Sequence, residues 1–362
     1  MPDYTRREFA AAMAAGAMAA PHHGAIEPGQ LPRTAAGSLT DVPGIKVGHY
    51  TDTRRPTGCT AILFDSAVSA GVDYGSSAPG ESMGVMLQPV SPVEKIHALF
   101  LTGGGVLSLP SSGGVLRFLE ERHLGFDWGT PGLRIPIVVS AVIDDLAVGD
   151  PHIRPDVEAA YKACVAAASG PVAEGNVGVG AGATVGKMHR SRGLGGMKGG
   201  VGTASIKLGD VVIAALAVVN AAGDILDWRS GRIIAGARRA DGGFADSVDF
   251  MRGIVTGAKG DAPIEDPALR STTLAVVATN VALEKTPLTK VAMMANCGAA
   301  RAIRPYHTTG DGDSLFALST GALTRPNLQL TVIGSLAADL VAEAIVRGVR
   351  AARSVEGWPA IG

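Results

Sequence analysis

The chain has 362 residues, of which 46% are hydrophobic and 18% are charged, and its formal net charge is −1. This is enough apolar material for one large core, or for two lobes that share one. The near-neutral charge disfavours nucleic acid or an anionic membrane as the main partner, because either would require a basic surface. No apolar run after residue 20 is long enough to cross a bilayer.

The N-terminal segment resembles a twin-arginine export signal. An Arg-Arg pair at residues 6–7 precedes a short, weakly apolar stretch, and Ala-Met-Ala at 17–19 offers a small-residue cleavage site. Such a signal is an address read by a receptor and not part of the fold; the alternative is an Ala-rich amphipathic or disordered terminus. We predict a signal over 1–20 and a linker over 21–38. With this signal the protein is expected to be periplasmic or secreted; if the segment is not a signal, the protein is expected to be cytoplasmic.

From Leu39 onward, strand-like and helix-like runs alternate. Short apolar runs with many β-branched residues predict buried strands at 59–65, 97–104, 135–143 and 203–225, the last interrupted by a hairpin turn at 208–210. Apolar residues that recur on one side predict helices at 113–123 and 154–169.

The segment 229–270 differs from its neighbours because it is polar and rich in glycine, which predicts an exposed, partly mobile loop. After it we predict a strand at 273–279, a helix from Thr286-Pro287, strands at 314–321 and 328–333, and a closing helix over 335–354. The pattern is mixed α/β with layered helices and sheets, and we expect a single domain over 39–362.

The glycine-rich segment GNVGVGAGATVGKM at 175–188 does not form a nucleotide-binding loop. In a Walker loop, a first glycine is followed by four residues of any type, then by Gly-Lys, and then by a hydroxyl residue. In this chain Ala181 stands in place of the first glycine, and Met188 stands in place of the hydroxyl residue. The segment also lacks two features of the dinucleotide-binding fingerprint, namely a clear preceding strand and a third glycine. We therefore exclude nucleotide binding.

A metal site and a serine triad are also disfavoured. The 8 histidines are scattered, without a helix-spaced pair beside a carboxylate. The glycine-rich segment 101–114 does not have the G-x-S-x-G spacing of a nucleophile elbow. No metal and no cofactor are expected.

One metal-free route uses a hydroxyl residue at a new chain N-terminus, whose own α-amine acts as the base. The α-amine has an unperturbed pKa of about 7.7 to 8.0, so it can accept the proton near neutral pH. The chemistry requires a cut directly before a Ser or Thr at the edge of a buried strand, after an exposed loop. Ser271, Thr272 and Thr273 have this position before the apolar run 274–278, although a plain turn-to-strand transition has the same pattern.

The chain resembles the family of D-aminopeptidases, L-aminopeptidase/D-esterases and β-peptidyl aminopeptidases, which also holds the nylon-oligomer hydrolases. The resemblance covers roughly residues 39–352 and rests on segments that occur in the right order. These segments are DVPGIKVGHYTD, TGCTAILFD, LTGGGVLSLPSSGGV, GVGAGATVGKM, GMKGGVGTASI, AVVNAAGD, STTLAVVATN and RAIRPYHTTGDGDSLFALSTG.

The resemblance implies a four-layer αββα sandwich of the N-terminal-nucleophile type and a precursor that cuts itself into two associated chains. The nucleophile matches Thr272, so the cut falls between Ser271 and Thr272. Relatives carry Asn or Gly before the cut, and the departure at Ser271 puts the rate of processing in question. The resemblance also implies a homo-oligomer of processed two-chain units.

Further roles follow from the resemblance. Asn220 matches the asparagine that stabilises the oxyanion, and Lys198 matches the lysine near the nucleophile in the nylon-hydrolase branch. Asp311 and Asp313 match the pair that orients the new amine and the nucleophile; residues i and i+2 of an extended segment face the same way. Taken singly, each of these residues is most often a turn residue or a solvated charge.

Asp144 departs from the family pattern. Many relatives carry Tyr or Phe at the aligned position, where a tyrosine would be a second oxyanion donor. An ionised aspartate would repel the oxyanion, so we expect Asp144 to bind the ammonium group of a substrate.

The expected function is a self-processing amidohydrolase that cleaves an amide next to a small N-terminal residue of a small molecule or short peptide. Alternatives are an amidase for oligomers of ω-amino acids, an acyl transferase similar to the ornithine acetyltransferases, and a scaffold without activity.

Overall fold

The computed structural model describes residues 37–189, 193–257 and 271–361. These residues belong to a compact unit, Ala35–Gly362. The predicted signal over 1–20, and the linker over 21–38 except for its last two residues, lie outside the described part. Among the helices that the structure describes, none combines the length and the apolar character needed to span a bilayer.

The described helices differ widely in length. The α-helices are α2 (Gly113–Glu120), α3 (Val157–Val165), α4 (Ser247–Val255), α5 (Lys285–Ala302) and α6 (Leu330–Arg350). The 3-10 helices are η1 (Leu39–Asp41), η2 (Gly84–Leu87), η3 (Gly105–Ser112) and η4 (Gly178–Gly182).

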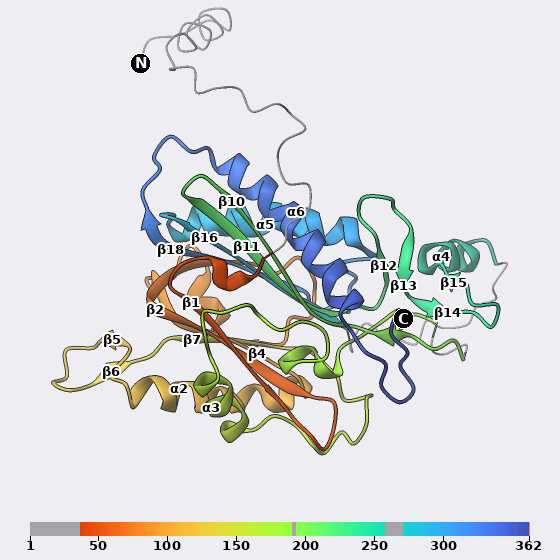
Figure 1. Cartoon of the computed structure of the whole chain (residues 1–362), viewed down its shortest axis with the longest axis horizontal. Helices are drawn as coiled ribbons and strands as arrows, with labels where there is room; N and C mark the ends of the chain where they lie inside the picture. Colours follow the sequence, from red (N-terminus) through yellow and green to blue (C-terminus); the bar gives the residue numbers. More distant parts are fainter. Residues whose placement is uncertain (1–36, 190–192, 258–270, 362) are drawn as a thin grey trace, which may run out of the picture. The chain divides into compact units, whose positions relative to one another are not determined.

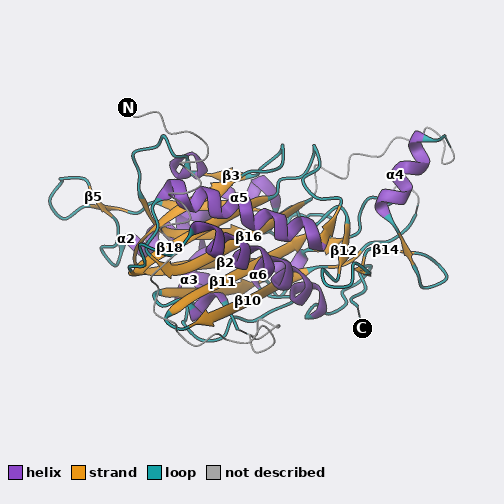
Figure 2. Cartoon of the chain, turned by 90° about the horizontal axis from the view of Figure 1, so that it is seen from above, coloured by secondary structure: helices purple, strands orange, loops and turns teal. Residues whose placement is uncertain are grey.

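One large mixed sheet forms the centre of the fold (Figures 1 and 2). Its strands, in spatial order, are β10 (Gly200–Leu208), β11 (Val211–Asn220), β16 (Thr272–Val281), β18 (Ser314–Leu323), β2 (Gly58–Asp73), β4 (Lys95–Thr102), β7 (Val138–Val142) and β3 (Glu81–Ser82), with β1 (Ile45–Thr51) also paired to β2.

Smaller pairings complete the strand set. They are β12 (Asp224–Leu226) with β13 (Ile233–Ala235) and β17 (Ile303–Arg304), β14 (Ala237–Arg238) with β15 (Phe244–Ala245), β5 (Phe126–Asp127) with β6 (Arg134–Ile135), and β8 (Thr184–Val185) with β9 (Met197–Lys198).

The long strand β2 folds the large sheet into two packed layers. Its first half pairs with β1 and most of β4, and its last residues, from Ser69 to Asp73, pair with β18. The register with β4 shifts between Leu63 and Val68, and such an irregularity bends a strand and increases its twist. One layer therefore contains β10, β11, β16 and β18, and the other contains β1, β4 and β7.

Neighbouring residues along a strand point to opposite faces of its layer and pack into different hydrophobic cores. The residues of each core therefore show which layers lie next to each other. Val277 on β16 packs into the core that holds α5 and α6, whereas its neighbour Val276 packs between the two sheet layers. On the other layer, Leu99 faces the same central core and Phe100 faces α2 and α3. The result is the predicted four-layer αββα sandwich, with α5 and α6 on one outer face and α2 and α3 on the other (Figure 1).

Burial on both faces explains why the central strands have nearly continuous apolar sequences rather than alternating ones. All residues of β16 are buried. The predicted strands at 59–65, 97–104, 135–143, 273–279 and 314–321, the hairpin at 203–225, and the predicted helices at 113–123 and 154–169 are all found in the structure.

Two sequence predictions are wrong. The segment 328–333 is not a strand, because α6 already begins at Leu330: Leu330, Ile333 and Ala337 recur at helical spacing and pack on the outer core. The described part of 229–270 is not only a loop but contains β13, β14, β15 and α4. Asp246 caps α4 by accepting from the backbone N–H groups of its first turn, and Phe250 is buried. Residues 258–270 lie outside the described part.

Candidate active site

Thr272 is the first residue of β16 and is buried in the uncut chain. On one side it pairs in register with Asn220, the last residue of β11. On the other side β16 runs parallel to β18, with Leu274 opposite Ser314. Parallel pairing places the entries of both strands at the same edge, so the segment 311–313 that leads into β18 lies beside Thr272.

The carbonyl oxygen of Ser271 accepts two hydrogen bonds. The hydroxyl Oγ1 of Thr272 donates to it over 2.7 Å, and the backbone N–H of Gly312 donates over 3.0 Å. A Cβ atom on Gly312 would lie 2.7 Å from Thr272 Oγ1 and 2.7 Å from the carbonyl oxygen of Ala78. Only glycine therefore brings a backbone donor this close to the predicted cut without displacing the hydroxyl.

Asp313 ties the start of β16 to the segment before β18. Its Oδ1 accepts the backbone N–H of Thr273 over 2.6 Å, and its Oδ2 accepts the backbone N–H of His307 over 3.2 Å. The ring Nδ1 of His307 is also 3.2 Å from Oδ2. His307 has a φ of 56°, a left-handed conformation that costs energy for a residue with a side chain and is frequent at functional sites.

Asp311 is buried but only partly satisfied. Its Oδ2 accepts the backbone N–H of Thr308 over 2.9 Å, whereas its Oδ1 has no hydrogen-bond partner among the described residues. Burial and the neighbouring carboxylate of Asp313 raise the pKa of Asp311 to about 6, while the positive charge of Lys187 acts in the opposite direction. A carboxyl group with this pKa can change its protonation state close to neutral pH.

Asn220 has a defined side-chain orientation. Its Oδ1 accepts the backbone N–H of Thr184 over 3.0 Å and the ammonium Nζ of Lys187 over 3.1 Å. Because both partners are donors, the oxygen must point toward them. The opposite end of the amide, Nδ2, donates to the backbone carbonyl of Asp144 over 3.1 Å.

Lys198 is fully buried, and its ammonium group donates to three backbone carbonyls. The acceptors are Gly180 at 2.9 Å, Ala183 at 2.8 Å and Gly199 at 3.0 Å. Burial lowers the pKa of Lys198 to about 7, and Asp145 opposes this shift. These contacts use all three N–H donors of the ammonium form. The role near the nucleophile stays a prediction.

Asp144 contributes its backbone to the site. Its carbonyl oxygen accepts from Asn220, while its side-chain Oδ1 accepts the backbone N–H of Leu146 within its own turn. The carboxylate is half-buried, and its predicted contact with a substrate ammonium group stays a prediction.

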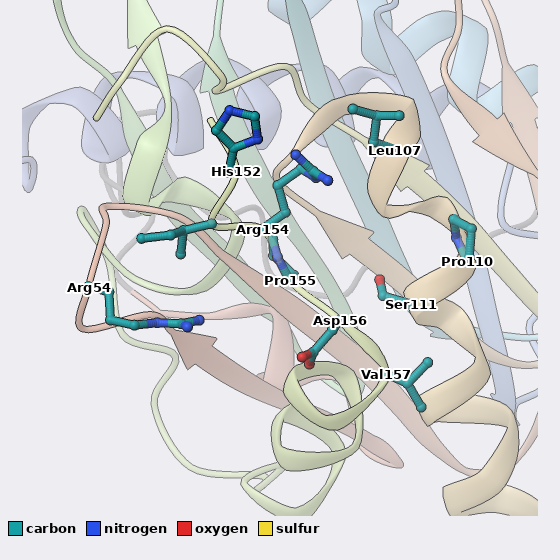
Figure 3. A pocket seen from close by; sticks show the side chains of 10 residues that line it. Arg54, Leu107, Pro110, Ser111, His152, Arg154, Pro155, Asp156 and Val157 are labelled. Carbon is teal, nitrogen blue, oxygen red and sulfur yellow. The ribbon is translucent and has the colours of Figure 1, made fainter. Parts of the chain in front are cut away.

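A surface cavity of about 460 Å³ lies between η3 and the start of α3 (Figure 3). Its lining is Arg54, Leu107, Pro110, Ser111, His152, Ile153, Arg154, Pro155, Asp156 and Val157. Arg54 is held by Asp52 in an ion pair of 2.6 Å, and Asp156 caps α3. None of the predicted catalytic residues lines this cavity.

The structure thus joins Thr272, Ser271, Asp313 and Asn220 through register or hydrogen bonds, with Asp311 directly before Gly312. Three neighbouring residues were missed from the sequence: Gly312, His307 and Lys187. Gly312 and His307 lie within RPYHTTGDGDS, and Lys187 lies within GVGAGATVGKM. Both segments were used for the resemblance, but the sequence contains no signal that selects these residues.

Comparison with known proteins identifies the family. The model of peptidase family S58 matches residues 37–360. The chain belongs to peptidase family S58.

Relatives in this family agree with a peptide-bond hydrolase. An uncharacterized aminopeptidase of Mycobacterium bovis is 38% identical over 348 residues, which cover 89% of this chain and 96% of that protein. A 6-aminohexanoate-oligomer endohydrolase of Kocuria sp. is 29% identical over 324 residues, which cover 86% of this chain and 85% of that protein. The S58 protein described here is therefore an enzyme that hydrolyses peptide or amide bonds.

A solved structure confirms the fold. The L-aminopeptidase D-Ala-esterase/amidase from Ochrobactrum anthropi, described as a variant of the Ntn hydrolase fold, superposes with a TM-score of 0.61 at 23% identity and covers 89% of both chains. The αββα sandwich of this S58 chain thus has the Ntn hydrolase fold.

Proposed function

We propose that this S58 chain is a self-processing amidohydrolase of the aminopeptidase type, which cuts itself between Ser271 and Thr272 and then uses Thr272 as nucleophile. One observation carries the proposal: the Thr272 hydroxyl and the Gly312 N–H both donate to the carbonyl oxygen of Ser271. A nucleophile beside a carbonyl that a backbone N–H polarises is the arrangement that acyl transfer requires.

Self-cleavage then proceeds by acyl transfer from nitrogen to oxygen. Oγ1 of Thr272 attacks the carbonyl carbon of Ser271, and the Gly312 N–H stabilises the charge on the carbonyl oxygen. We propose Asp311 as the acceptor of the hydroxyl proton, because it directly precedes Gly312, whose N–H contacts the same carbonyl oxygen, and burial raises its pKa. The proton passes to the departing nitrogen, the C–N bond breaks, and water hydrolyses the resulting ester to the Ser271 carboxylate and the free Thr272 hydroxyl.

Turnover repeats this chemistry on a substrate amide. The new α-amine of Thr272 takes the hydroxyl proton as Oγ1 attacks the substrate carbonyl, and the amide group of Asn220 donates to the oxyanion. The amine then gives the proton to the leaving amine of the substrate. Water hydrolyses the acyl-enzyme ester and restores Thr272. Asp313 anchors the start of β16 during both half-reactions.

We propose that the substrate is a small amino amide or a short peptide with a small N-terminal residue. The carboxylates of Asp144, Asp311 and Asp313 support recognition of a free ammonium group. The second candidate is an oligomer of ω-amino acids, because a relative at 29% identity is a 6-aminohexanoate-oligomer endohydrolase. Competition between alanine p-nitroanilides and the 6-aminohexanoate dimer separates the two candidates.

We further propose that residues 39–362 form one processed domain of two chains, that this unit assembles into a homo-oligomer, and that residues 1–20 direct export. N-terminal sequencing of the mature protein detects both predicted cuts, the removal of the signal and the cleavage between Ser271 and Thr272. Native mass spectrometry measures the number of units in the oligomer. A protein that stays in the cytoplasm and still starts at Met1 would contradict the export proposal.

The decisive variant is Thr272→Ala, which removes the attacking oxygen. We expect an uncut chain by intact mass and a loss of turnover of at least about a thousandfold. The matched control is Thr273→Val, because Oγ1 of Thr273 is buried without a hydrogen-bond partner among the described residues, so that its loss should leave cleavage intact. An active protein that remains a single chain would overturn the proposal.

A further inference from the structure

The surface cavity between η3 and the start of α3 has no part in the mechanism proposed above (Figure 3). Its volume of about 460 Å³ is within the range of small-molecule sites, about 300 to 1,000 Å³. Half of its lining residues are apolar, namely Leu107, Pro110, Ile153, Pro155 and Val157. Leu107 is 62% exposed and Val157 is 39% exposed. Exposed apolar side chains gathered around a hollow are suited to the hydrocarbon part of a ligand.

The cavity also contains a guanidinium group that has no carboxylate partner. Nη1 of Arg154 donates to the backbone carbonyl of Pro151 over 2.7 Å, and Arg154 forms no ion pair among the described residues. The other arginine of the lining, Arg54, is paired with Asp52 over 2.6 Å. The carboxylate of the lining, Asp156, accepts a backbone N–H in the first turn of α3. Arg154 is thus the lining cation that can bind a carboxylate of a ligand.

The turn at the start of η3 contacts both the cavity and the candidate active site. A Cβ atom on Gly104 would lie 3.2 Å from the Cβ atom of Arg154. A Cβ atom on the next residue, Gly105, would lie 3.8 Å from the carboxyl carbon of Asp144. The backbone carbonyl of Asp144 accepts from the amide of Asn220 over 3.1 Å. One turn of backbone therefore links Arg154 to the surroundings of the proposed oxyanion donor.

The two residues after this turn, Val106 and Leu107, are 63% and 62% exposed. Leu107 lines the cavity, whereas Val106 has its side chain near Gly80, where a Cβ atom would lie 3.6 Å from it. The segment of Gly80 reaches the acidic side of the site, because the N–H of Ala78 donates to the carbonyl of Asp311 over 2.9 Å. Exposed apolar surface thus offers a path for an extended substrate from the nucleophile to the cavity.

We propose that this cavity is a subsite for the leaving-group end of the substrate, in which Arg154 binds a free carboxylate and Leu107 contacts the hydrocarbon part. The inference rests on the proposed function and deepens it, because it assigns to the enzyme substrates that end in a carboxylate. Short peptides and oligomers of ω-amino acids both have this end. Binding remote from the reacting bond holds the ground state and the transition state equally, so it lowers KM with little effect on kcat.

The test compares the parent with Arg154→Met, Arg154→Lys and the matched control Lys207→Met, which removes an exposed positive charge from β10. The substrates are Ala-Leu, Ala-Ala-Leu, Ala-Ala-Ala-Leu and the dimer and trimer of 6-aminohexanoate, each with a free carboxylate and as the C-terminal amide. Chromatography of the products gives kcat and KM. The lengths differ because an extended chain gains about 3.3 to 3.6 Å per residue, so the series shows which length reaches the cavity.

The expected result is a preference for the acid that depends on Arg154. For substrates long enough to reach the cavity, we expect the parent to have a KM about tenfold lower for the acid than for the amide, because the amide loses the charge-assisted bond. In Arg154→Met the two KM values should be equal. Arg154→Lys should retain part of the preference, since lysine keeps the charge without the planar fork. Lys207→Met should keep the parent preference.

The outcomes separate the two proposals. An active parent with equal KM for acid and amide at every length overturns the inference while the proposed function stands. A preference that persists in Arg154→Met also overturns it, because another group then binds the carboxylate. So does an equal rise in KM for acid and amide in Arg154→Met, which is the result of a purely structural arginine. A parent that cleaves none of these substrates overturns the proposed function and the subsite with it.

Discussion

Two buried polar clusters lie at strand ends of this molecule, and they differ in how completely their hydrogen bonds are made. In the Asp145 cluster (Arg55, Thr57 and Asp145), Oδ1 of Asp145 accepts from Arg55 and from the backbone N–H of Gly104, both over 2.9 Å, and Oδ2 accepts from Thr57 over 2.7 Å. Arg55 also donates to the carbonyls of Val148, Ile153 and Asp145.

The Asp311 cluster (His307, Asp311 and Asp313) has unused atoms. Oδ1 of Asp311 and Nε2 of His307 are buried without a hydrogen-bond partner among the described residues. A buried polar group without a partner costs free energy, so its presence needs a reason. We therefore expect the saturated cluster to hold the fold together, and the unsaturated one to be available to a new amine or a substrate.

The largest effect on stability should come from breaking the saturated cluster. Arg55→Met leaves the carboxylate of Asp145 buried without its cation, and we expect the free energy of unfolding to fall by about 3 to 5 kcal/mol. Urea unfolding measures the change. Arg54→Met is the matched control, since the Arg54 side chain is 66% exposed and solvent screens its ion pair with Asp52, so that its loss should change stability much less. Equal losses in both variants would contradict the distinction between buried and exposed pairs.

Lys198→Met tests a buried cation outside the Asp145 cluster. The variant leaves the carbonyls of Gly180, Ala183 and Gly199 without their donor, and we expect a loss of about 3 kcal/mol. Chemical denaturation checks it against Lys207→Met, which should change stability by less than about 0.5 kcal/mol. A Lys198→Met protein as stable as the parent would mean that water replaces the ammonium group.

Asp224 is intermediate between the two clusters, because Oδ2 accepts the backbone N–H of Ser247 over 2.8 Å while Oδ1 has no partner among the described residues. Burial raises the pKa of Asp224 to about 6. Between the unfolded pKa of about 3.9 and this value, the folded state binds more protons, so the contribution to stability falls as pH rises.

Asp224→Asn should remove that dependence and keep the acceptor for Ser247. We expect the difference in unfolding free energy between parent and variant to change by about 2 kcal/mol from pH 4 to pH 7, in favour of the variant at the higher pH. Parallel denaturation curves at several pH values give this difference. A difference that is constant with pH would show that Asp224 titrates normally.

The smallest expected effect concerns Asp144, whose carboxylate is half-buried beside the site. Asp144→Asn should raise KM for substrates with a free amine several-fold, corresponding to about 1 kcal/mol for a partly exposed charge pair. The measurement is the ratio of turnover for free-amine and N-capped versions of the same substrate. If that ratio is the same in parent and variant, the carboxylate does not bind the ammonium group.

The sequence predicted the central strands well, because strands covered on both faces require long apolar runs. It was less successful where periodicity was ambiguous. The letters LQLTVI alternate like a strand, yet Leu330 and Ile333 also fit the helical period that α6 continues. In 229–257 the polar composition concealed α4, which a cap and one buried aromatic ring at Phe250 stabilise.

By itself, the sequence determined the layered α/β class, the hydroxyl residue at the entry of a buried strand, and the motif set that marks the family. The tertiary structure decided which polar groups meet that hydroxyl. Strand register brings Asn220 to Thr272, parallel pairing brings Gly312 to the carbonyl of Ser271, and a turn at Gly186 brings Lys187 to Asn220. These contacts join residues far apart in the chain, and the register that creates them is set by burial of whole strand faces rather than by the residues of the site.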